Sequence, residues 1–180
     1  MVIHSDRLNL IPLTPDFMRA ILRHDLGEVE HLLGSPLPAD WTDCERLLSL
    51  RLGQLEADPS LQPWLLRAIV RRSDRIMVGH IGFHEAPGPE HYRDISPGAA
   101  EFGFEVFEPF RRQGFAREAA LALMQWASQS HGVTKFVVTI EPDNEPSQAL
   151  AAKLGFVRIG SHIDEIDGVE DILERRVLAD

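Results

Sequence analysis

The chain has 180 residues, of which 44% are hydrophobic and 26% are charged, and its formal net charge at pH 7 is -10. That composition predicts one compact domain with a substantial core, and the excess of 28 acidic over 18 basic residues disfavours nucleic acid as a partner. No apolar run is long enough for a membrane span and the N-terminus lacks a leader pattern, so we expect a cytoplasmic protein with no membrane partner. Cys44 is the single cysteine, which excludes an intrachain disulfide and indicates a buried structural thiol.

The N-terminal part of the chain predicts a strand followed by helices. Residues Arg7 to Thr14 alternate apolar side chains as an edge strand does. Thr14-Pro15-Asp16 has the chemistry of a helix start, and the apolar spacing before Gly34 fits one broken helix or two short ones. After Trp41 the spacing predicts a further helix, which stops near Asp58-Pro59.

Two strand candidates come next, Trp64 to Arg71 and Ile76 to Phe83, and the polar turn Ser73-Asp74 between them predicts a hairpin. Gly79 and Gly82 are costly in an ordinary strand, so we expect them to permit a bulge or close packing.

The segment Glu101 to Ala116 (EFGFEVFEPFRRQGFA) carries the clearest chemical signal. Its first residues alternate as a strand, and helical spacing resumes at Phe115. Between them lies a turn with Arg111, Arg112 and Gly114, followed by Arg117. The first N–H groups of a helix have no partner inside it and carry partial positive charge, so a basic, glycine-containing turn at a helix start predicts an anion site.

The remaining elements are a strand at Lys135 to Ile140, a helix from about Pro146 to Leu154 that ends at Gly155, and a terminal hairpin around Asp167-Gly168. The last strand is expected near Ile172 to Leu178. The Pro- and Gly-rich stretch from Ala86 to Ala100 predicts a long loop, either mobile or covering a site.

This order of elements resembles the GNAT superfamily of acyl-CoA-dependent N-acetyltransferases, and within it the branch of bacterial ribosomal-protein N-terminal acetyltransferases. Ser5 to Thr14 (SDRLNLIPLT) is similar to the first strand of that branch. Arg111-x-x-Gly114-x-Ala116 matches its pyrophosphate loop, with Ala in place of a frequent Gly. Asn144-x-x-Ser147 followed by Leu154-Gly155-Phe156 matches its last core helix, and Asp167-Gly168 falls at its final hairpin. The resemblance covers nearly the whole chain.

The resemblance implies an α+β fold in a single domain, residues 1–180. It implies a mixed, mostly antiparallel central sheet of about seven strands with splayed central strands, flanked by about four helices. The implied activity is transfer of an acetyl group from acetyl-CoA to a primary amine by direct attack.

Acetyl-CoA is the implied cosubstrate. Its phosphates would bind at the basic turn and the helix start. Its pantetheine arm would pair with the edge of the central strand. The acetyl carbonyl would then lie near the N–H of Val106 or its neighbour, which could donate to the tetrahedral oxyanion. The residues assigned to the cofactor are Phe104, Glu105, Val106, Arg111, Arg112, Gln113, Gly114, Phe115, Ala116, Arg117, Asn144 and Ser147. For Asn144, capping of the helix and cofactor binding are both open.

The resemblance also implies the catalytic groups. Glu101 lies where several relatives carry the general base, acting directly or through water; Glu105, on the same strand face, is its competitor and Glu141 a weaker third candidate. Many relatives have a Tyr as the acid for the leaving thiolate, but that position is Ala151 here. Ser147 is the candidate acid instead, and a role in bonding a backbone group is equally open.

No metal is predicted, because His80 and His84 lack a supporting ligand pattern and are expected in the core or lining a cleft. The acceptor is expected to be a peptide N-terminus, a polyamine or another small amine, selected by residues 17–55 and 86–100. A homodimer through the last strands is an option. The missing tyrosine keeps an alternative open, a catalytically weak acyl-CoA-binding sensor or partner-binding module.

Overall fold

The computed structural model describes residues 1–37, 44–164 and 168–177. The chain divides into two compact units. Unit 1 consists of Met1–Gly82 and Phe104–Ala122, and unit 2 consists of Phe83–Gly103 and Leu123–Asp180. The expectation of a single domain therefore stays a prediction.

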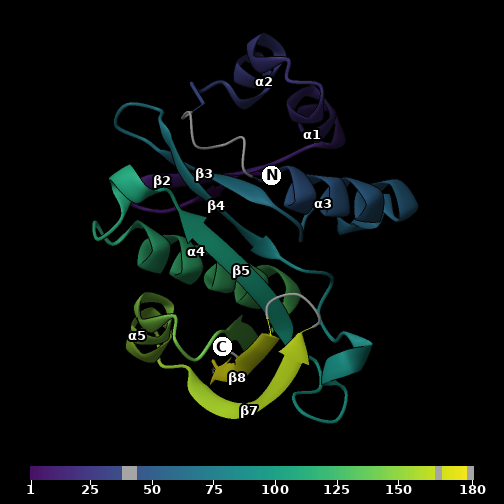
Figure 1. Ribbon diagram of the computed structural model, residues 1–180, viewed down its shortest axis with the longest axis vertical. Coiled ribbons are helices and arrows are strands. Elements are labelled where there is room, and N and C mark those ends of the chain that lie inside the picture. Colours follow the sequence, from purple (N-terminus) through teal and green to yellow (C-terminus); the bar gives the residue numbers. More distant parts are fainter. Residues whose placement is uncertain (38–43, 165–167, 178–180) are drawn as a thin grey trace. The chain divides into compact units, whose positions relative to one another are not determined.

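Within the described residues, eight strands form one sheet in the order β1-β2-β3-β4-β5-β6-β8-β7 (Figure 1). The strands are β1 (Ile3–His4), β2 (Leu8–Pro12), β3 (Arg67–Arg71), β4 (Met77–Phe83), β5 (Ala100–Val106), β6 (Lys135–Ile140), β7 (Val157–Asp164) and β8 (Gly168–Arg176). The ladder between β5 and β6 is parallel, and those of β1–β2, β2–β3, β3–β4, β6–β8 and β7–β8 are antiparallel. The predicted α+β class is confirmed, with the short β1 as a strand that the sequence did not predict.

The described helices are α1 (Pro15–Leu22), α2 (Leu26–Leu33), α3 (Glu45–Ala57), α4 (Phe115–His131) and α5 (Glu145–Lys153). The first helical region is two short helices because its capping chemistry occurs twice. The Thr14 side chain accepts from the N–H of Phe17, and after a break at His24 the Asp25 side chain caps α2 by accepting from Glu28. In the described part of the chain, no helix combines the length and apolar character needed to cross a membrane.

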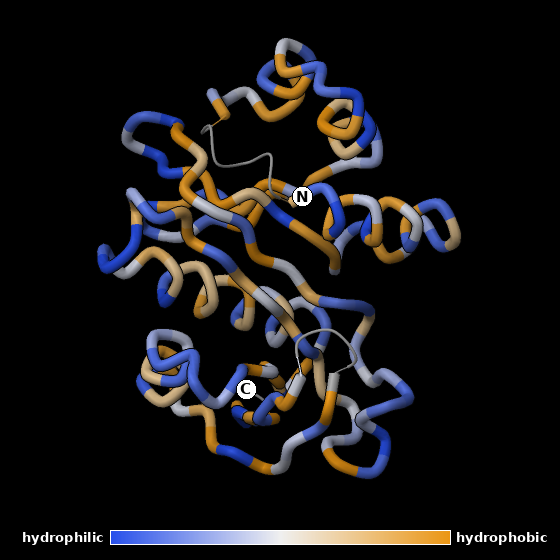
Figure 2. Tube along the Cα trace, viewed as in Figure 1, coloured by the Kyte–Doolittle hydropathy of each residue, from blue (hydrophilic) through white to orange (hydrophobic). Residues whose placement is uncertain are grey.

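The core of unit 1 lies between α1, α2 and α3 and the strands β3 and β4. Helix α1 packs against both α2 and α3, and their apolar faces meet buried strand residues such as Ala68, Val70 and Met77. In Figure 2, β3 and β4 are mostly hydrophobic, whereas the turn between them is hydrophilic. The predicted hairpin is confirmed, although β3 begins at Arg67 and not at Trp64.

Gly82 explains how β4 packs within unit 1. A Cβ atom at this position would lie 2.7 Å from the Cα of Leu66, closer than real Cβ atoms approach backbone. The close packing expected at this glycine is therefore confirmed.

Unit 2 is built around aromatic side chains. The ring of Phe83 lies 6.0 Å from Phe102 and 6.4 Å from both Trp126 and Phe136, and Phe102 also contacts Phe156. Such edge-on and stacked pairs add stabilisation beyond their buried area. This cluster fixes the start of β5, which carries Glu101, against α4 and β6.

The C-terminal elements of unit 2 agree with most of the sequence-based expectations. β6 has the predicted bounds, and Gly155 follows α5 with a φ of 80°. β8 begins at Gly168, earlier than expected, and pairs with β7 as a hairpin. Asp167 and Leu178, which were expected in the turn and the last strand, lie outside the described residues.

Candidate active site

The central strand β5 runs on beyond its pairing with β6. The described ladder joins Ala100 to Phe136 and Glu101 to Val137, and β5 then continues to Val106. The described ladder of β5 and β6 thus ends at Glu101, and the expected splay of the central strands stays a prediction. Backbone groups of β5 beyond Glu101 are accordingly candidates for pairing with an extended ligand.

Gly79 of β4 allows β5 to approach closely within unit 1. A Cβ atom at this position would lie 2.1 Å from the carbonyl oxygen of Glu105 and 2.9 Å from the Cα of Val106. The Phe107 N–H donates to the Val78 carbonyl at 3.0 Å. Because successive N–H groups of a strand point to opposite edges, the N–H of Val106 points to the edge of β5 that does not face β4.

The turn after β5 has the backbone geometry of an anion site. Arg112 and Gly114 both lie in the left-handed region, with φ of 61° and 82°. Helix α4 begins immediately afterwards at Phe115, and residues 111–114 are exposed. Its first N–H groups have no partner within the helix, so they can donate to an anion. The Arg111 side chain turns back toward β5, and its Nε donates to the Val106 carbonyl at 2.9 Å.

Arg7, which lies directly before β2, braces this turn within unit 1. Its Nη1 donates to the Gln113 carbonyl at 3.2 Å, its Nε pairs with Glu118 of α4 at 2.6 Å, and its guanidinium lies 4.8 Å from the centre of the Phe115 ring. The hydroxyl of Ser5 and the N–H of Arg7 donate to the other Glu118 oxygen, each at 2.7 Å. Burial alone would raise the pKa of Glu118, but these hydrogen bonds outweigh it and lower that pKa.

This bracing role of Arg7 was not predicted from the sequence. Arg7 falls in a motif that indicated only a first strand, and its partner lies 111 residues away. The observable signal was a basic residue just before a strand, which does not identify a contact.

Glu101 is a buried carboxylate surrounded by donors from unit 2. The Thr139 hydroxyl donates to its Oε1 at 2.9 Å, and the Nδ1 atom of His84 and the Nε2 atom of His91 lie 3.3 and 3.6 Å from its Oε2. Tyr92 also hydrogen-bonds to it. Burial would raise the pKa of Glu101, but the hydrogen bond and charge of His84 and the hydrogen bonds of Thr139 and Tyr92 outweigh it and hold the pKa at about 2. The side chain is therefore an anion throughout the neutral range.

None of these partners of Glu101 was predicted from the sequence. Tyr92, the only tyrosine, was noted only as a loop residue, yet it is 3% exposed and reaches Glu101. Burial, followed by the charge of Glu101, raises the Tyr92 pKa well above its usual value, so its proton stays on the phenol. The His84 Nε2 faces Gly103 of β5, since a Cβ at 103 would meet it at 2.9 Å.

Glu105 has a different environment from Glu101. Its side chain is 47% exposed, and its partners are His80 at 3.2 Å and Arg111 at 3.9 Å, all within unit 1. The hydrogen bond from His80 is the main reason that the pKa of Glu105 is lowered. The two carboxylates that competed as candidate base thus belong to separate side-chain clusters.

The α5 residues lie in unit 2, as does Glu101. The Asn144 Oδ1 accepts from the N–H of Ser147 at 3.2 Å, so the capping role expected for Asn144 is confirmed. Ser147 is partly buried, and Ala151, at the position where many relatives carry the tyrosine, is 3% exposed.

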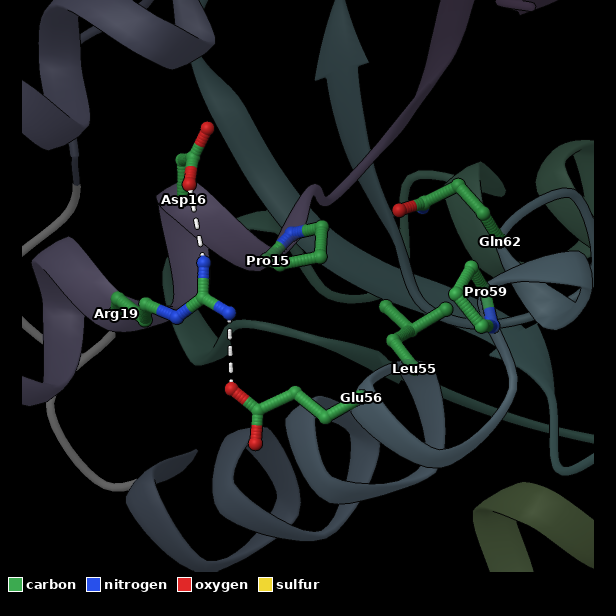
Figure 3. A pocket seen from close by; sticks show the side chains of 7 residues that line it. All are labelled: Pro15, Asp16, Arg19, Leu55, Glu56, Pro59 and Gln62. Atoms are coloured by element: carbon green, nitrogen blue, oxygen red, sulfur yellow. Dashed lines mark hydrogen bonds and ion pairs between the residues drawn. The ribbon is translucent and has the colours of Figure 1, made fainter.

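A groove of about 570 Å³ lies between α1, the end of α3 and the turn at Pro59–Leu61 (Figure 3). Arg19 crosses it and pairs with Asp16 at 3.1 Å and with Glu56 at 2.8 Å. None of the predicted cofactor or catalytic residues lines it. Two of its seven lining residues, Arg19 and Leu55, fall in the range 17–55 where acceptor selection was expected.

Comparison with known proteins agrees with the resemblance. The family described as acetyltransferase (GNAT) domain matches residues 7–157. The uncharacterized N-acetyltransferase YoaA of Bacillus subtilis is 33% identical over 92 residues, which cover 51% of this chain and 48% of YoaA. The chain thus spans about half the length of the curated relatives that it matches first.

Solved structures show the same fold at low identity. A ribosomal-protein-serine acetyltransferase structure from Vibrio cholerae, titled as putative, has a TM-score of 0.66 and 20% identity, covering 98% of each chain. RimL, titled as a ribosomal L7/L12 alpha-N-protein acetyltransferase in complex with coenzyme A, has a TM-score of 0.66 and 19% identity, covering 100% of each chain.

Proposed function

The chain belongs to the acetyltransferase (GNAT) domain family, and from this premise we propose that it transfers the acetyl group of acetyl-CoA to a primary amine. The observation that carries the proposal is the turn between β5 and α4. In this turn, Arg112 and Gly114 have left-handed backbone conformations and lead into the start of α4. Arg7 stabilises the turn by binding the Gln113 carbonyl and Glu118 of α4. Such a turn suits the pyrophosphate of coenzyme A.

In the proposed complex, the cofactor lies along β5 and ends at α4. The amides and cations of residues 111–117 bind the phosphates, and residues Phe104 to Val106 offer backbone groups to the amide-rich pantetheine arm. Asn144 and Ser147 contribute from α5. That RimL is titled as a coenzyme A complex supports this choice of ligand.

We propose the Val106 N–H as the donor to the oxyanion formed when the amine attacks the thioester. Of the two amides considered, that of Phe107 donates to Val78, whereas alternation along the strand turns the Val106 N–H to the other edge. An oriented amide of this kind stabilises the tetrahedral intermediate without reorganisation.

We retain Glu101 as the base and propose that it works through a neighbour. A carboxylate with a pKa of about 2 is a weak proton acceptor by itself near neutral pH. The His84 imidazole can accept the amine proton at Nε2 while its Nδ1–H donates to Glu101, 3.3 Å away. A water held by Glu101 is the other route. Glu105 remains the competing candidate.

Ser147 remains our candidate for protonating the leaving thiolate. Ala151 supplies no acidic group, and the Tyr92 hydroxyl is engaged with Glu101. A serine hydroxyl at the first turn of α5 can donate to sulfur while its own N–H is held by Asn144.

The acceptor in this proposal is a peptide N-terminus, a polyamine or another small amine. An α-amino group has a reference pKa of about 8, whereas a lysine amine has one of about 10.4, so the first needs less help from a base. The names of the V. cholerae and RimL structures, which refer to ribosomal proteins, support the peptide option. A cytoplasmic location and a homodimer belong to the same proposal.

One observation favours a second candidate, an acyl-CoA-binding sensor or partner-binding module with weak catalysis. The position where many relatives carry a tyrosine is Ala151, whose methyl side chain has no proton to donate. The cofactor turn would serve either function equally well.

The deciding experiment is acceptor-dependent release of free coenzyme A thiol from acetyl-CoA, measured with a panel of N-terminal peptides, polyamines and aminoglycosides. Turnover with one class identifies the enzyme and its acceptor. Tight acetyl-CoA binding without turnover across the panel supports the module.

Cofactor binding is tested separately with paired variants. The double change Arg111→Ala with Arg112→Ala should weaken acetyl-CoA affinity by about tenfold or more, because it removes charge-assisted hydrogen bonds. The control Arg23→Ala with Arg46→Ala removes two exposed arginines elsewhere in unit 1 and should leave the affinity unchanged. Equal affinity in both double variants would show that the phosphates bind elsewhere.

A further inference from the structure

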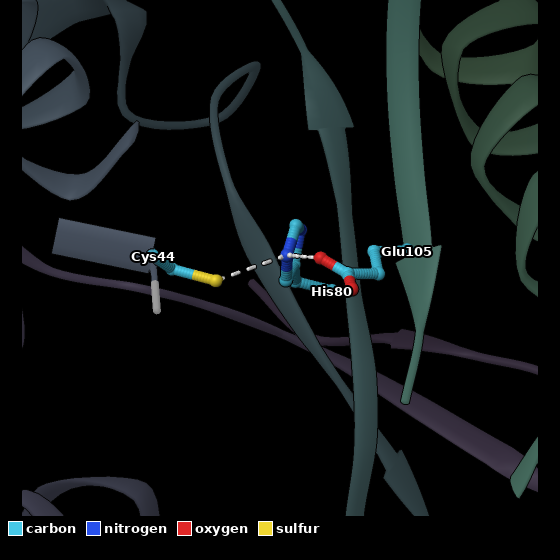
Figure 4. Close-up of side chains that lie close together, drawn as sticks. All are labelled: Cys44, His80 and Glu105. Atoms are coloured by element: carbon cyan, nitrogen blue, oxygen red, sulfur yellow. Dashed lines mark hydrogen bonds and ion pairs between the residues drawn. The ribbon is translucent and has the colours of Figure 1, made fainter. Parts of the chain in front are cut away.

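Three chemically different donors converge in unit 1. Cys44 lies directly before α3, His80 lies in the middle of β4, and Glu105 lies near the end of β5 (Figure 4). Their Sγ, ring nitrogen and carboxylate oxygen atoms all lie within 4.8 Å of one another. Among the residues that the structure describes, this is the group of three or more Cys, His, Asp or Glu side chains that could hold a metal ion.

Cys44 and Glu105 contact the same ring atom of His80. Its Nε2 lies 3.6 Å from the Cys44 Sγ and 3.2 Å from the Glu105 Oε2. In a proton relay the nucleophile and the carboxylate engage opposite nitrogens of the imidazole, because each nitrogen carries one proton or one lone pair. Two partners on one nitrogen instead place three potential ligand atoms around a common point. When an ion binds, the His80 Nε2 and the Cys44 thiol would each release a proton, so that both offer lone pairs to the metal.

The separations match the edges of a tetrahedral zinc site. Zinc bonds of about 2.0–2.1 Å to nitrogen, 2.3 Å to sulfur and 2.0–2.2 Å to oxygen, at tetrahedral angles, place nitrogen and sulfur about 3.5 Å apart and nitrogen and oxygen about 3.3 Å apart. The observed values are 3.6 and 3.2 Å. The nitrogen–sulfur and nitrogen–oxygen separations therefore already have the lengths that a tetrahedral zinc site requires.

The surroundings also suit a divalent cation. A thiolate and a carboxylate together balance two positive charges, and a thiolate with an imidazole favours zinc over magnesium or calcium. His80 is 6% exposed and packs edge-on against Phe107, which fixes the ring, whereas Glu105 is partly exposed and leaves a path for the ion. Arg111 lies 3.9 Å from the second Glu105 oxygen and can orient it from outside.

We propose that Cys44, His80 and Glu105 form a binding site for Zn²⁺ or a similar transition-metal ion, with a fourth position open to water or another ligand. The sequence predicted no metal, because the three residues lie on separate elements and show no motif spacing. An ion here would tie the start of α3 to β4 and β5. The proposal does not depend on acetyl transfer.

The test is a titration of the full, untagged chain with Co²⁺ as a spectroscopic substitute for zinc. We expect one ion per chain, the strong visible bands of a four-coordinate site and a thiolate-to-cobalt charge-transfer band, all lost on addition of equimolar Zn²⁺. Cys44→Ser should abolish the charge-transfer band. Glu105→Gln should weaken Zn²⁺ binding by roughly 100-fold or more, because changing a residue that only supports a ligand already costs about 10–100-fold.

The matched control is Glu108→Gln, an exposed glutamate of unit 1 three residues from Glu105, which should bind as the unchanged protein does. Circular dichroism checks that each variant is folded. If Cys44→Ser does not fold, the comparison of Glu105→Gln with Glu108→Gln alone decides the test. A cobalt spectrum without a thiolate band would overturn the proposal, and so would equal zinc affinity in Glu105→Gln and Glu108→Gln.

Discussion

Replacement of Glu101 by Gln should remove a specific part of the acid sensitivity of the protein. The pKa of Glu101 falls from 4.5 to about 2 on folding. Because the folded pKa is the lower one, the ionised group stabilises the fold above pH 4.5, and that stabilisation is lost as the pH falls toward 2. At 1.36 kcal/mol per pH unit, the full contribution is about 3 kcal/mol, of which about 2 kcal/mol is lost between pH 5 and pH 3.

The measurement is urea unfolding followed by tryptophan fluorescence at several pH values between about 5 and 3. The unchanged protein should lose about 2 kcal/mol more of its free energy of unfolding over this range than Glu101→Gln does. Glu108→Gln, which removes an exposed carboxylate, should behave as the unchanged protein. Parallel pH curves for the unchanged protein and Glu101→Gln would refute the idea that Thr139, His84 and Tyr92 hold this carboxylate ionised.

Three further predictions concern packing and the cofactor turn. Gly79→Ala should lower the free energy of unfolding by about 1–3 kcal/mol in urea titrations, because the new Cβ would lie 2.1 Å from the backbone carbonyl oxygen of Glu105. An unchanged urea midpoint would contradict this contact. Arg7→Ala should raise the KM for acetyl-CoA several-fold by loosening the turn, whereas Arg23→Ala should not, and equal KM values would exclude bracing. Phe83→Ala should cost about 3–5 kcal/mol by emptying the aromatic core of unit 2, and a loss below 1 kcal/mol in thermal unfolding would show that the core collapses into the space.

Local chemistry made much of the fold predictable. The Thr14 cap and Gly34 stop follow directly from residue types, and the β6 strand from Lys135 to Ile140 (KFVVTI) has the bounds expected. The turn before Phe115 was also predictable, because a glycine, two arginines and a change from strand to helix spacing lie next to one another. Each of these signals spans only a few residues.

The side-chain clusters were not predictable, because their members come from distant elements. Glu101 was selected by its place in the family pattern, but the pattern did not include Tyr92 or His84, and it gave no reason to expect so low a pKa. Arg7 and Cys44 likewise acquire their partners only when separate strands and helices pack. Periodicity reports which face of an element is buried, and it does not report which residue of another element meets that face.

The path of the chain between the two units has a consequence for any attempt to divide this protein. The chain passes from one unit to the other between Gly82 and Phe83, between Gly103 and Phe104, and between Ala122 and Leu123. These positions fall inside β4, β5 and α4, respectively. No single cut in the gene would yield either unit as an uninterrupted polypeptide, so isolating the unit with Gly114 or the unit with Glu101 would require joining segments that are not consecutive in the chain.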